Sequence, residues 1–182
     1  MKKLILITFL IALSLKGISQ ENMFTLGGGY SFANIQDTET QGTGWRINGL
    51  YEFNPSGGMF AHGISLGYVS ITATEGTGAL TVENKIHSVP IYYAPKLLLG
   101  KNKIKGFVKG AIGLQFAGLD RTGFIEVSDS DMGFYGGGGA GIMVFLKENI
   151  FINAEYEIAW VSNSAFSDGW MNTAGGGIGF KF

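Results

Sequence analysis

Residues 150–160 read IFINAEYEIAW, and they alternate apolar and polar side chains more regularly than any other stretch of the chain. A period of two is the pattern of a β-strand, because successive side chains point to opposite faces. The stretch therefore predicts a strand whose two faces meet different surroundings. The two faces are Ile150, Ile152, Ala154, Tyr156, Ile158 and Trp160 on one side, and Phe151, Asn153, Glu155, Glu157 and Ala159 on the other.

The same alternation recurs along the chain. Three further stretches have it in weaker form, and a glycine run at 136–139 blurs one of them. Four other stretches show it clearly, so with 150–160 and the three weaker stretches the chain has eight predicted strands, a number that closed transmembrane barrels adopt. The clear stretches are 24–33, 45–53, 60–68 and 170–182, and the weaker ones are 87–98, 105–118 and 132–146.

Short and long connections between these strands alternate along the chain. Short turns on one rim and longer loops on the other are typical of transmembrane barrels. We therefore predict an all-β fold, an eight-stranded antiparallel up-and-down transmembrane β-barrel, with both termini at the short-turn rim and the longer loops facing outside. The short turns are at 54–58, 99–104 and 147–149, and the longer polar loops are at 36–43, 72–83, 119–130 and 162–169.

The composition excludes several other classes of protein. Thirty glycines with only three prolines do not fit collagen, and 46% hydrophobic residues do not fit charged disorder. Cysteine is absent, so disulfides, thiolate metal sites and lipoprotein anchors are excluded. The formal charge of −1 is too balanced to suggest binding to nucleic acid. One domain of 182 residues is expected.

The N-terminus has the pattern of a secretion signal. Lys2 and Lys3 precede an apolar run at 4–15 that is too short to span a bilayer, and Gly17 and Ser19 suit a cleavage site. We predict a signal peptide at 1–19 and a barrel domain at 20–182. Removing three lysines and no acid from a charge of −1 leaves a mature charge of −4.

The apolar face of the strands is expected to meet lipid. It is larger and more aromatic than the opposite face, which is rich in Gly, Ala, Ser and Thr and suits the narrow interior of an eight-stranded barrel. Aromatic side chains gather at the two ends of the strands, as in the girdles of membrane barrels. The predicted girdles are Trp45, Trp160 and Trp170 beside the long loops, and Tyr51, Phe53, Phe60 and Phe180 beside the short turns.

The end of the chain resembles a known family. The ending GGGIGFKF, with Phe182 last, is similar to the terminal strand of small outer-membrane β-barrel domains of the porin-like and OmpX-like group. The segment VPIYY at 89–93 resembles one recurrent in the Bacteroidetes members of that group. The resemblance implies an outer-membrane location, lipid and lipopolysaccharide as surroundings, and recognition of Phe182 by the barrel-assembly machinery.

Charged side chains on the opposite face would point into the lumen, where a charge is tolerated only if it is paired or wet. We predict two ionic clusters that plug the barrel, one near the outer rim and one near the inner rim. Pro90 and Pro95 each remove a ladder donor, so we expect a β-bulge near Pro90 and a strand end near Pro95. The outer cluster holds Arg46 and Glu157, the inner one holds Glu52, Lys109 and Lys181, and Glu155 also faces the lumen.

Three patterns could indicate chemistry, and each has a simpler interpretation. Gly136, Gly138 and Gly141 match G-x-G-x-x-G, but the chain continues as a strand where a nucleotide site needs a helix. His62 and His87 lack a serine or acid at the same-face spacing that would orient them. The carboxylates in the third long loop (Asp120, Glu126, Asp129 and Asp131) do not match an EF-hand, so a solvated acidic loop is expected rather than a Ca²⁺ site.

We therefore predict a monomeric, non-enzymatic outer-membrane barrel without cofactor, metal or nucleic-acid partner. Its loops would serve envelope integrity, adhesion or host interaction. The alternatives are a narrow channel for small solutes, a lipid-modifying enzyme that uses His87, and a soluble ligand-binding barrel with its apolar face inside.

Overall fold

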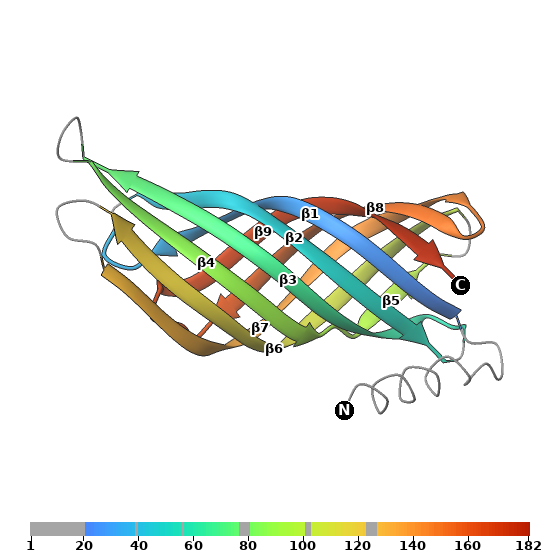
Figure 1. Ribbon diagram of the computed structural model, residues 1–182. Helices are drawn as coiled ribbons and strands as arrows, with labels where there is room; N and C mark the ends of the chain where they lie inside the picture. Colours follow the sequence, from blue (N-terminus) through green and yellow to red (C-terminus); the bar gives the residue numbers. More distant parts are fainter. Residues whose placement is uncertain (1–20, 39, 56, 77–80, 101–102, 123–126) are drawn as a thin grey trace, which may run out of the picture.

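The computed structural model describes residues 21–38, 40–55, 57–76, 81–100, 103–122 and 127–182, and its strands close into an antiparallel barrel (Figure 1). Consecutive strands pair with each other, except that β4 and β5 both pair with β3 and β6, and β1 pairs with β9 to close the sheet. The predicted eight-stranded barrel is confirmed, because β4 and β5 together form one span. The strands are β1 (Glu21–Ile35), β2 (Gln41–Asn54), β3 (Phe60–Glu75), β4 (Val82–Tyr93), β5 (Lys96–Leu99), β6 (Ile104–Thr122), β7 (Val127–Lys147), β8 (Ile150–Val161) and β9 (Phe166–Lys181).

The fourth span corrects both expectations about proline. β4 keeps one register with β3 on either side of Pro90, so no bulge forms there, although the ladder to β3 lacks the two pairs opposite Gly67 and Tyr68. The span also does not end at Pro95. β5 continues with the register that β4 had toward both β3 and β6, and Pro95 still accepts a hydrogen bond from Gly110 N at 2.8 Å. The break therefore interrupts pairing without changing which residues face inward.

The strands are longer than the sequence predicts at the end with the long connections. β6 and β7 remain paired to Arg121 and Val127, well inside the segment expected to be a loop at 119–130. β3 and β4 likewise pair out to Glu75 and Val82. Polar residues such as Asp and Ser end an apolar pattern, but their backbone groups continue the ladder equally well. The sheet therefore extends beyond the apolar belt.

The two ends of the barrel differ. The start of β1 and the C-terminus lie at one end, which we call the termini end, and the opposite end is the loop end (Figure 1). The predicted signal peptide, 1–19, lies outside the described residues. In the described part of the chain no helix is long and apolar enough to cross a membrane.

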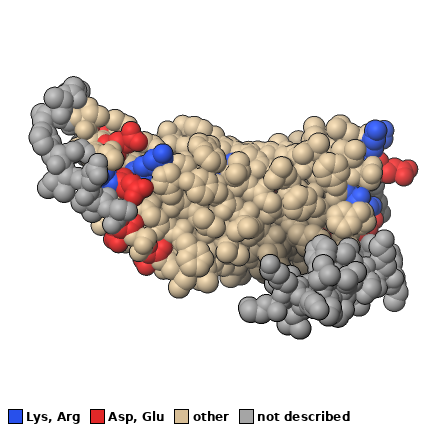
Figure 2. Space-filling model, in the orientation of Figure 1, with Lys and Arg blue, Asp and Glu red and all other residues tan. Residues whose placement is uncertain are grey.

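The outer surface between these ends is an apolar belt. In Figure 2 the middle of the molecule is almost free of Lys, Arg, Asp and Glu, which gather at the two ends. The large exposed side chains are those of the apolar faces seen in the sequence, among them Leu26, Ile47 and Ile158. A soluble barrel would hide this face. The alternative with the apolar face inside is therefore wrong.

Glycine allows the sheet to close tightly where β1 meets β9. Gly29 and Gly175 are direct partners in this ladder. A Cβ atom on Gly175 would lie 2.5 Å from the carbonyl oxygen of Gly28, and one on Gly29 would lie 2.7 Å from that of Ala174. Larger residues would force the strands apart, so the glycines of the last strand set the close approach that completes the barrel.

Candidate functional site

The lumen is filled by side chains in layers, and charged groups occupy its middle. Lys109 on β6, Gly139 on β7 and Glu157 on β8 follow one another across the ladder. Because Gly139 has no side chain, Lys109 Nζ reaches across it to Glu157 Oε2 at 2.7 Å. Lys109 also donates to Glu155 Oε1 at 2.9 Å. A glycine between two longer side chains thus creates the space for a buried ion pair.

Glu157 is the centre of a larger network. Its carboxylate forms a salt bridge with Arg46 on β2, and both side chains are almost completely buried. Tyr135 donates to Glu157 Oε1 at 2.6 Å and Tyr92 donates to Oε2 at 3.1 Å. The rings of these two tyrosines stack with their centroids 4.9 Å apart. We call these four residues (Arg46, Tyr92, Tyr135 and Glu157), together with Lys109 and Glu155, the central network.

The central network is electrically balanced. Arg46 and Lys109 supply two positive charges, and Glu155 and Glu157 supply two negative ones. Buried charges are tolerated when they are paired and hydrogen-bonded, which these are. The network therefore links β2, β4, β6, β7 and β8 across the lumen without a net charge.

A second buried ion pair lies closer to the termini end. Lys96 Nζ lies 2.6 Å from Glu52 Oε1, and both side chains are buried. The ammonium also lies over the ring of Phe107, 4.5 Å from its centroid. Lys96 and Lys109 are direct partners across the β5–β6 ladder, so two like charges share one wall. Each finds its carboxylate on another strand.

This arrangement differs from the two clusters expected from the sequence. Lys109 lies with Arg46 and Glu157 rather than with Glu52. Lys181 pairs with Glu21 at the rim, where Nζ lies 2.6 Å from Oε1 and both groups are partly exposed. Lys96 was missed because Pro95 was expected to end the strand. Continuing the alternation of β4 past that proline would have placed Lys96 on the inward face.

Apolar layers close the lumen on both sides of these charges. The layer near the termini end, the termini-end plug, contains Phe107, over whose ring Lys96 lies. The layer at the other side, the loop-end plug, is drawn from six strands. The termini-end plug is Met23, Leu98, Phe107, Met143 and Phe151, and the loop-end plug includes Ile35, Ile71, Ile86, Leu119, Val161 and Phe166.

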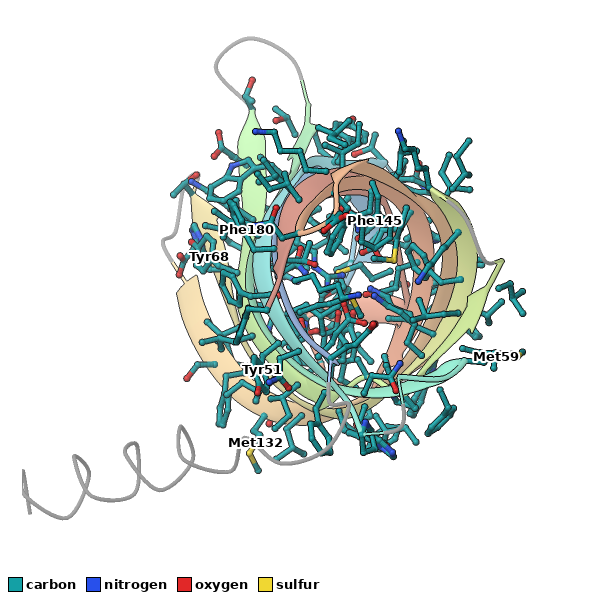
Figure 3. All side chains as sticks on the ribbon, turned by 90° about the vertical axis from the view of Figure 1, so that its right-hand side faces the viewer. Tyr51, Met59, Tyr68, Met132, Phe145 and Phe180 are labelled. Carbon is teal, nitrogen blue, oxygen red and sulfur yellow. The ribbon has the colours of Figure 1, made fainter. Side chains whose placement is uncertain are left out.

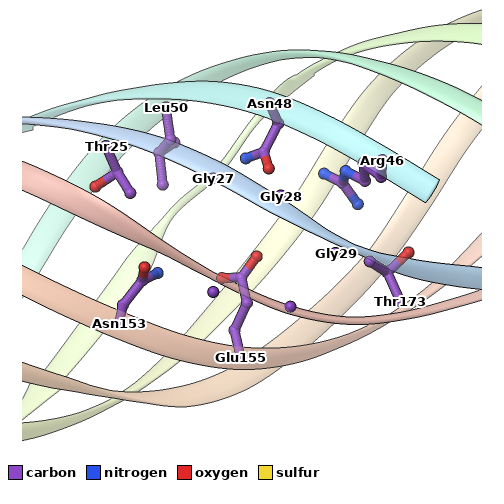
Figure 4. A pocket seen from close by; sticks show the side chains of 12 residues that line it. Thr25, Gly27, Gly28, Gly29, Arg46, Asn48, Leu50, Asn153, Glu155 and Thr173 are labelled. Atoms are coloured by element: carbon purple, nitrogen blue, oxygen red, sulfur yellow. The ribbon is translucent and has the colours of Figure 1, made fainter.

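A small cavity lies beside the central network, between β1, β2, β8 and β9 (Figure 4). Thr25 Oγ1, Arg46 Nε and Asn153 Oδ1 belong to residues that line it, and none of these atoms has a hydrogen-bond partner. Its free volume of about 10 Å³ suits a single water molecule. The cavity is too small for a solute.

A further contact crosses the mouth at the loop end. Arg121 on β6 donates from Nη2 to Gln36 O at 3.1 Å and to Asp37 Oδ2 at 3.0 Å. Gln36 N in turn donates to Ala165 O at 3.0 Å. β6 does not pair with β1, so the bonds of Arg121 tie the turn after β1 to a distant part of the rim, while the bond to Ala165 ties it to the turn before β9.

The predicted girdle residues lie at the two ends of the outer surface. Trp45, Trp160 and Trp170 are exposed near the loop end, and Trp160 and Trp170 are direct partners in the β8–β9 ladder. Tyr51, Phe60 and Phe180 are exposed near the termini end, whereas Phe53 is half-buried. Figure 3 faces the termini end and shows Phe180 outside the ring of strands.

The two histidines have partners that the sequence did not indicate. His87 Nδ1 bonds to the hydroxyl of Tyr68, and its Nε2 lies 3.8 Å from Asp120 Oδ2. The expectation that no acid lies at a suitable spacing is therefore wrong, because Asp120 lies on β6 two residues beyond the partner of His87. His62 Nδ1 bonds to the hydroxyl of Tyr93 at 2.5 Å.

The remaining sequence patterns form no site in the described residues. Gly136, Gly138 and Gly141 lie within β7, so the helix that a nucleotide site requires does not follow them. Asp120, Asp129 and Asp131 lie on strands rather than in a loop, and Glu126 lies outside the described residues. In the part of the chain that the structure describes, no group of three acidic or histidine side chains is arranged to hold a metal ion.

Comparisons with known proteins agree with this architecture. The family model described as "Outer membrane protein beta-barrel domain" matches residues 4–182. A search of curated protein sequences gave no match.

Solved structures show the same fold at low sequence identity. Ail, the attachment invasion locus protein of Yersinia pestis, is 16% identical with a TM-score of 0.60, over 91% of this chain and 100% of Ail. Neisserial surface protein A is 12% identical with a TM-score of 0.65, over 89% of this chain and 97% of that protein. Ail in complex with the heparin analogue sucrose octasulfate is 17% identical with a TM-score of 0.55, over 91% and 100%.

Proposed function

This chain belongs to the outer membrane protein β-barrel domain family, and from that premise we propose that it is a sealed, non-enzymatic barrel that presents its loop end at the cell surface. The filled lumen carries the proposal. The central network lies between the termini-end plug and the loop-end plug, and the cavity beside it has room for about one water. Side chains fill the interior of barrels of this size, so sealing needs no additional domain.

The orientation follows from the lengths of the connections. Barrels of the outer membrane have short periplasmic turns and longer extracellular loops. The termini end would then face the periplasm, as suits a chain delivered by a signal peptide at 1–19 and assembled from the periplasmic side. We propose that Phe182 is the residue that the assembly machinery recognises, and that the barrel functions as a monomer.

Conductance separates the sealed barrel from a narrow channel. Purified protein is reconstituted into a planar bilayer, and its insertion is verified by the heat-dependent shift in SDS mobility. We expect no steps of current for the intact protein, because two apolar plugs and a paired ionic layer block water. Stable unitary steps would refute the sealed barrel and favour the channel.

The contacts of His87 favour a barrel without catalytic activity. Ser70 is the direct partner of His87 across the β3–β4 ladder. A histidine that activates a serine needs a free ring nitrogen for the serine proton. Here Tyr68 engages Nδ1, and Nε2 faces Asp120. We expect cells with His87→Ala to have the same lipid A masses as cells with the unchanged protein, and a new acylated species would contradict this.

The charge of the loop end indicates which surface partners fit. Two cations, Lys85 and Arg121, stand among seven carboxylates at this end of the described residues. Figure 2 shows acidic side chains gathered there. A sulfated sugar such as the heparin analogue bound by Ail would be repelled. We propose that the loops contact neutral or cationic surfaces. The carboxylates are Asp37, Glu75, Glu83, Asp120, Asp129, Asp131 and Asp168.

Binding to immobilised heparin and to immobilised polylysine tests this role. Detergent-solubilised protein should pass over heparin at physiological ionic strength and be retained by polylysine. The neutralised variant Asp129→Asn with Asp131→Asn should be retained less by polylysine. Retention on heparin would refute the proposed charge preference and favour a polyanion-binding adhesin.

A further inference from the structure

The termini end carries a surface hollow with the opposite charge. Backbone bonds hold its walls in place: Phe145 N donates to Lys103 O at 2.7 Å, and Lys181 N donates to Asn149 O at 2.9 Å. The first bond joins the residue before β6 to the end of β7, and the second joins the turn between β7 and β8 to the end of β9. The hollow therefore has a scaffold of paired backbone rather than of free side chains.

Four lysines line the hollow, which has a volume of about 440 Å³. They are Lys103, Lys105, Lys147 and Lys181, and Glu148 is the one carboxylate among the described lining residues. Lys105 lies over the ring of Phe145, 5.2 Å from its centroid, and Lys181 pairs with Glu21. Within the described part of the chain, Lys103 and Lys147 have no ion pair. Their charges stay available to an anion.

The hollow is continuous with the apolar belt. Leu146 lines it and is 56% exposed. Ile104, next to Lys103, is 64% exposed, and it is paired with Val144 on the neighbouring strand. Figure 3 faces this end and shows Phe145 within the ring of strands. An occupant could thus place a chain along Leu146 and Ile104 while its charged group meets the lysines.

We propose that this hollow binds the phosphate headgroup of an anionic phospholipid in the leaflet at the termini end. The lysine ammonium groups neutralise the phosphate, and Leu146 and Ile104 contact the first part of an acyl chain. A soluble phosphate would contact the lysines alone, whereas a phospholipid also contacts Leu146 and Ile104 at the edge of the apolar belt. Only the choice of leaflet that supplies the lipid rests on the proposed membrane orientation.

Native mass spectrometry of the detergent-solubilised full chain tests the site. The protein is mixed with equal amounts of phosphatidylglycerol and phosphatidylcholine, and the two single-lipid adducts are compared. Each lysine near an anionic lipid favours it by about fivefold. We expect the phosphatidylglycerol adduct to exceed the phosphatidylcholine adduct by at least about fivefold, and the ratio to fall by at least about fivefold in Lys103→Gln with Lys147→Gln.

The matched control removes two cations at the loop end, Lys85→Gln with Arg121→Gln, and should keep the ratio of the unchanged protein. A cold SDS mobility like that of the unchanged protein establishes that each variant is folded. An unchanged ratio in the Lys103 and Lys147 variant, or an equal fall in the control, would overturn the proposal. The assay involves neither conductance nor orientation, so its failure is distinct from failure of the sealed barrel.

Discussion

Replacing Glu157 with glutamine tests whether the central network stabilises the barrel. Glu157 is 1% exposed and accepts from Arg46, Lys109, Tyr92 and Tyr135. Glutamine keeps one acceptor oxygen, brings an amide donor toward these donors and removes the charge. Lys109 would retain Glu155 at 2.9 Å, but Arg46 would lose the carboxylate that it contacts.

The expected loss in the free energy of unfolding is about 3–5 kcal/mol, the cost of leaving one member of a buried ion pair unpaired. The matched control is Glu21→Gln. Its partner, Lys181, is about as close, with Nζ 2.6 Å from Oε1, but the two groups are 31% and 33% exposed. Water screens such a pair, so its loss should cost less than about 1 kcal/mol.

Unfolding in urea of the barrel refolded into lipid vesicles measures these differences. The exposed Trp45, Trp160 and Trp170 report the loss of the lipid environment by fluorescence. The double variant Arg46→Gln with Glu157→Gln leaves Lys109 and Glu155 as a neutral pair. It should be more stable than the sum of the single losses predicts, by at least about 1 kcal/mol. A Glu157→Gln barrel as stable as Glu21→Gln would refute the reasoning.

Three further predictions concern the lumen, the lipid face and assembly. Gly139→Val should destabilise the barrel by about 1–3 kcal/mol in the same assay, because its Cβ would lie 2.7 Å from Tyr156 O; an equal loss in the outward-facing Ala140→Val would contradict this. Lipids brominated near the headgroup should quench the fluorescence of the three tryptophans more than lipids brominated at mid-chain. The reverse order would show that the tryptophans do not lie at the membrane interface. Phe182→Ala should refold in detergent within about 0.5 kcal/mol of the unchanged protein, because Phe182 bonds to Asn22 through its backbone. It should nevertheless lower the amount of barrel in cell membranes more than Phe180→Ala does, and equal amounts would argue against an assembly signal.

Most of the barrel is predictable because alternation is a local property of a strand. The face of each side chain in 150–160 follows from counting by two, and the structure agrees with that count. The same rule locates Arg46, Glu52, Glu155 and Glu157 on the inner wall. It is less informative at 132–146, where glycine on both faces hides the period, and past Pro95, where the missing donor predicts a strand end that the structure does not have.

The sequence by itself determined the strands, their two faces and the order in which they pair. Only the tertiary structure decided which charges meet. Lys109 and Glu157 are distant in the chain, and they are brought into line by the register of β6, β7 and β8 with Gly139 between them. Lys96 and Glu52 likewise meet across an intervening strand, β3, where Gly63 is the partner of Glu52 and Ala61 is the partner of Lys96. Side-chain period is fixed within a strand, but register and curvature arise only when the sheet closes, so the partners inside a barrel depend on the closed form.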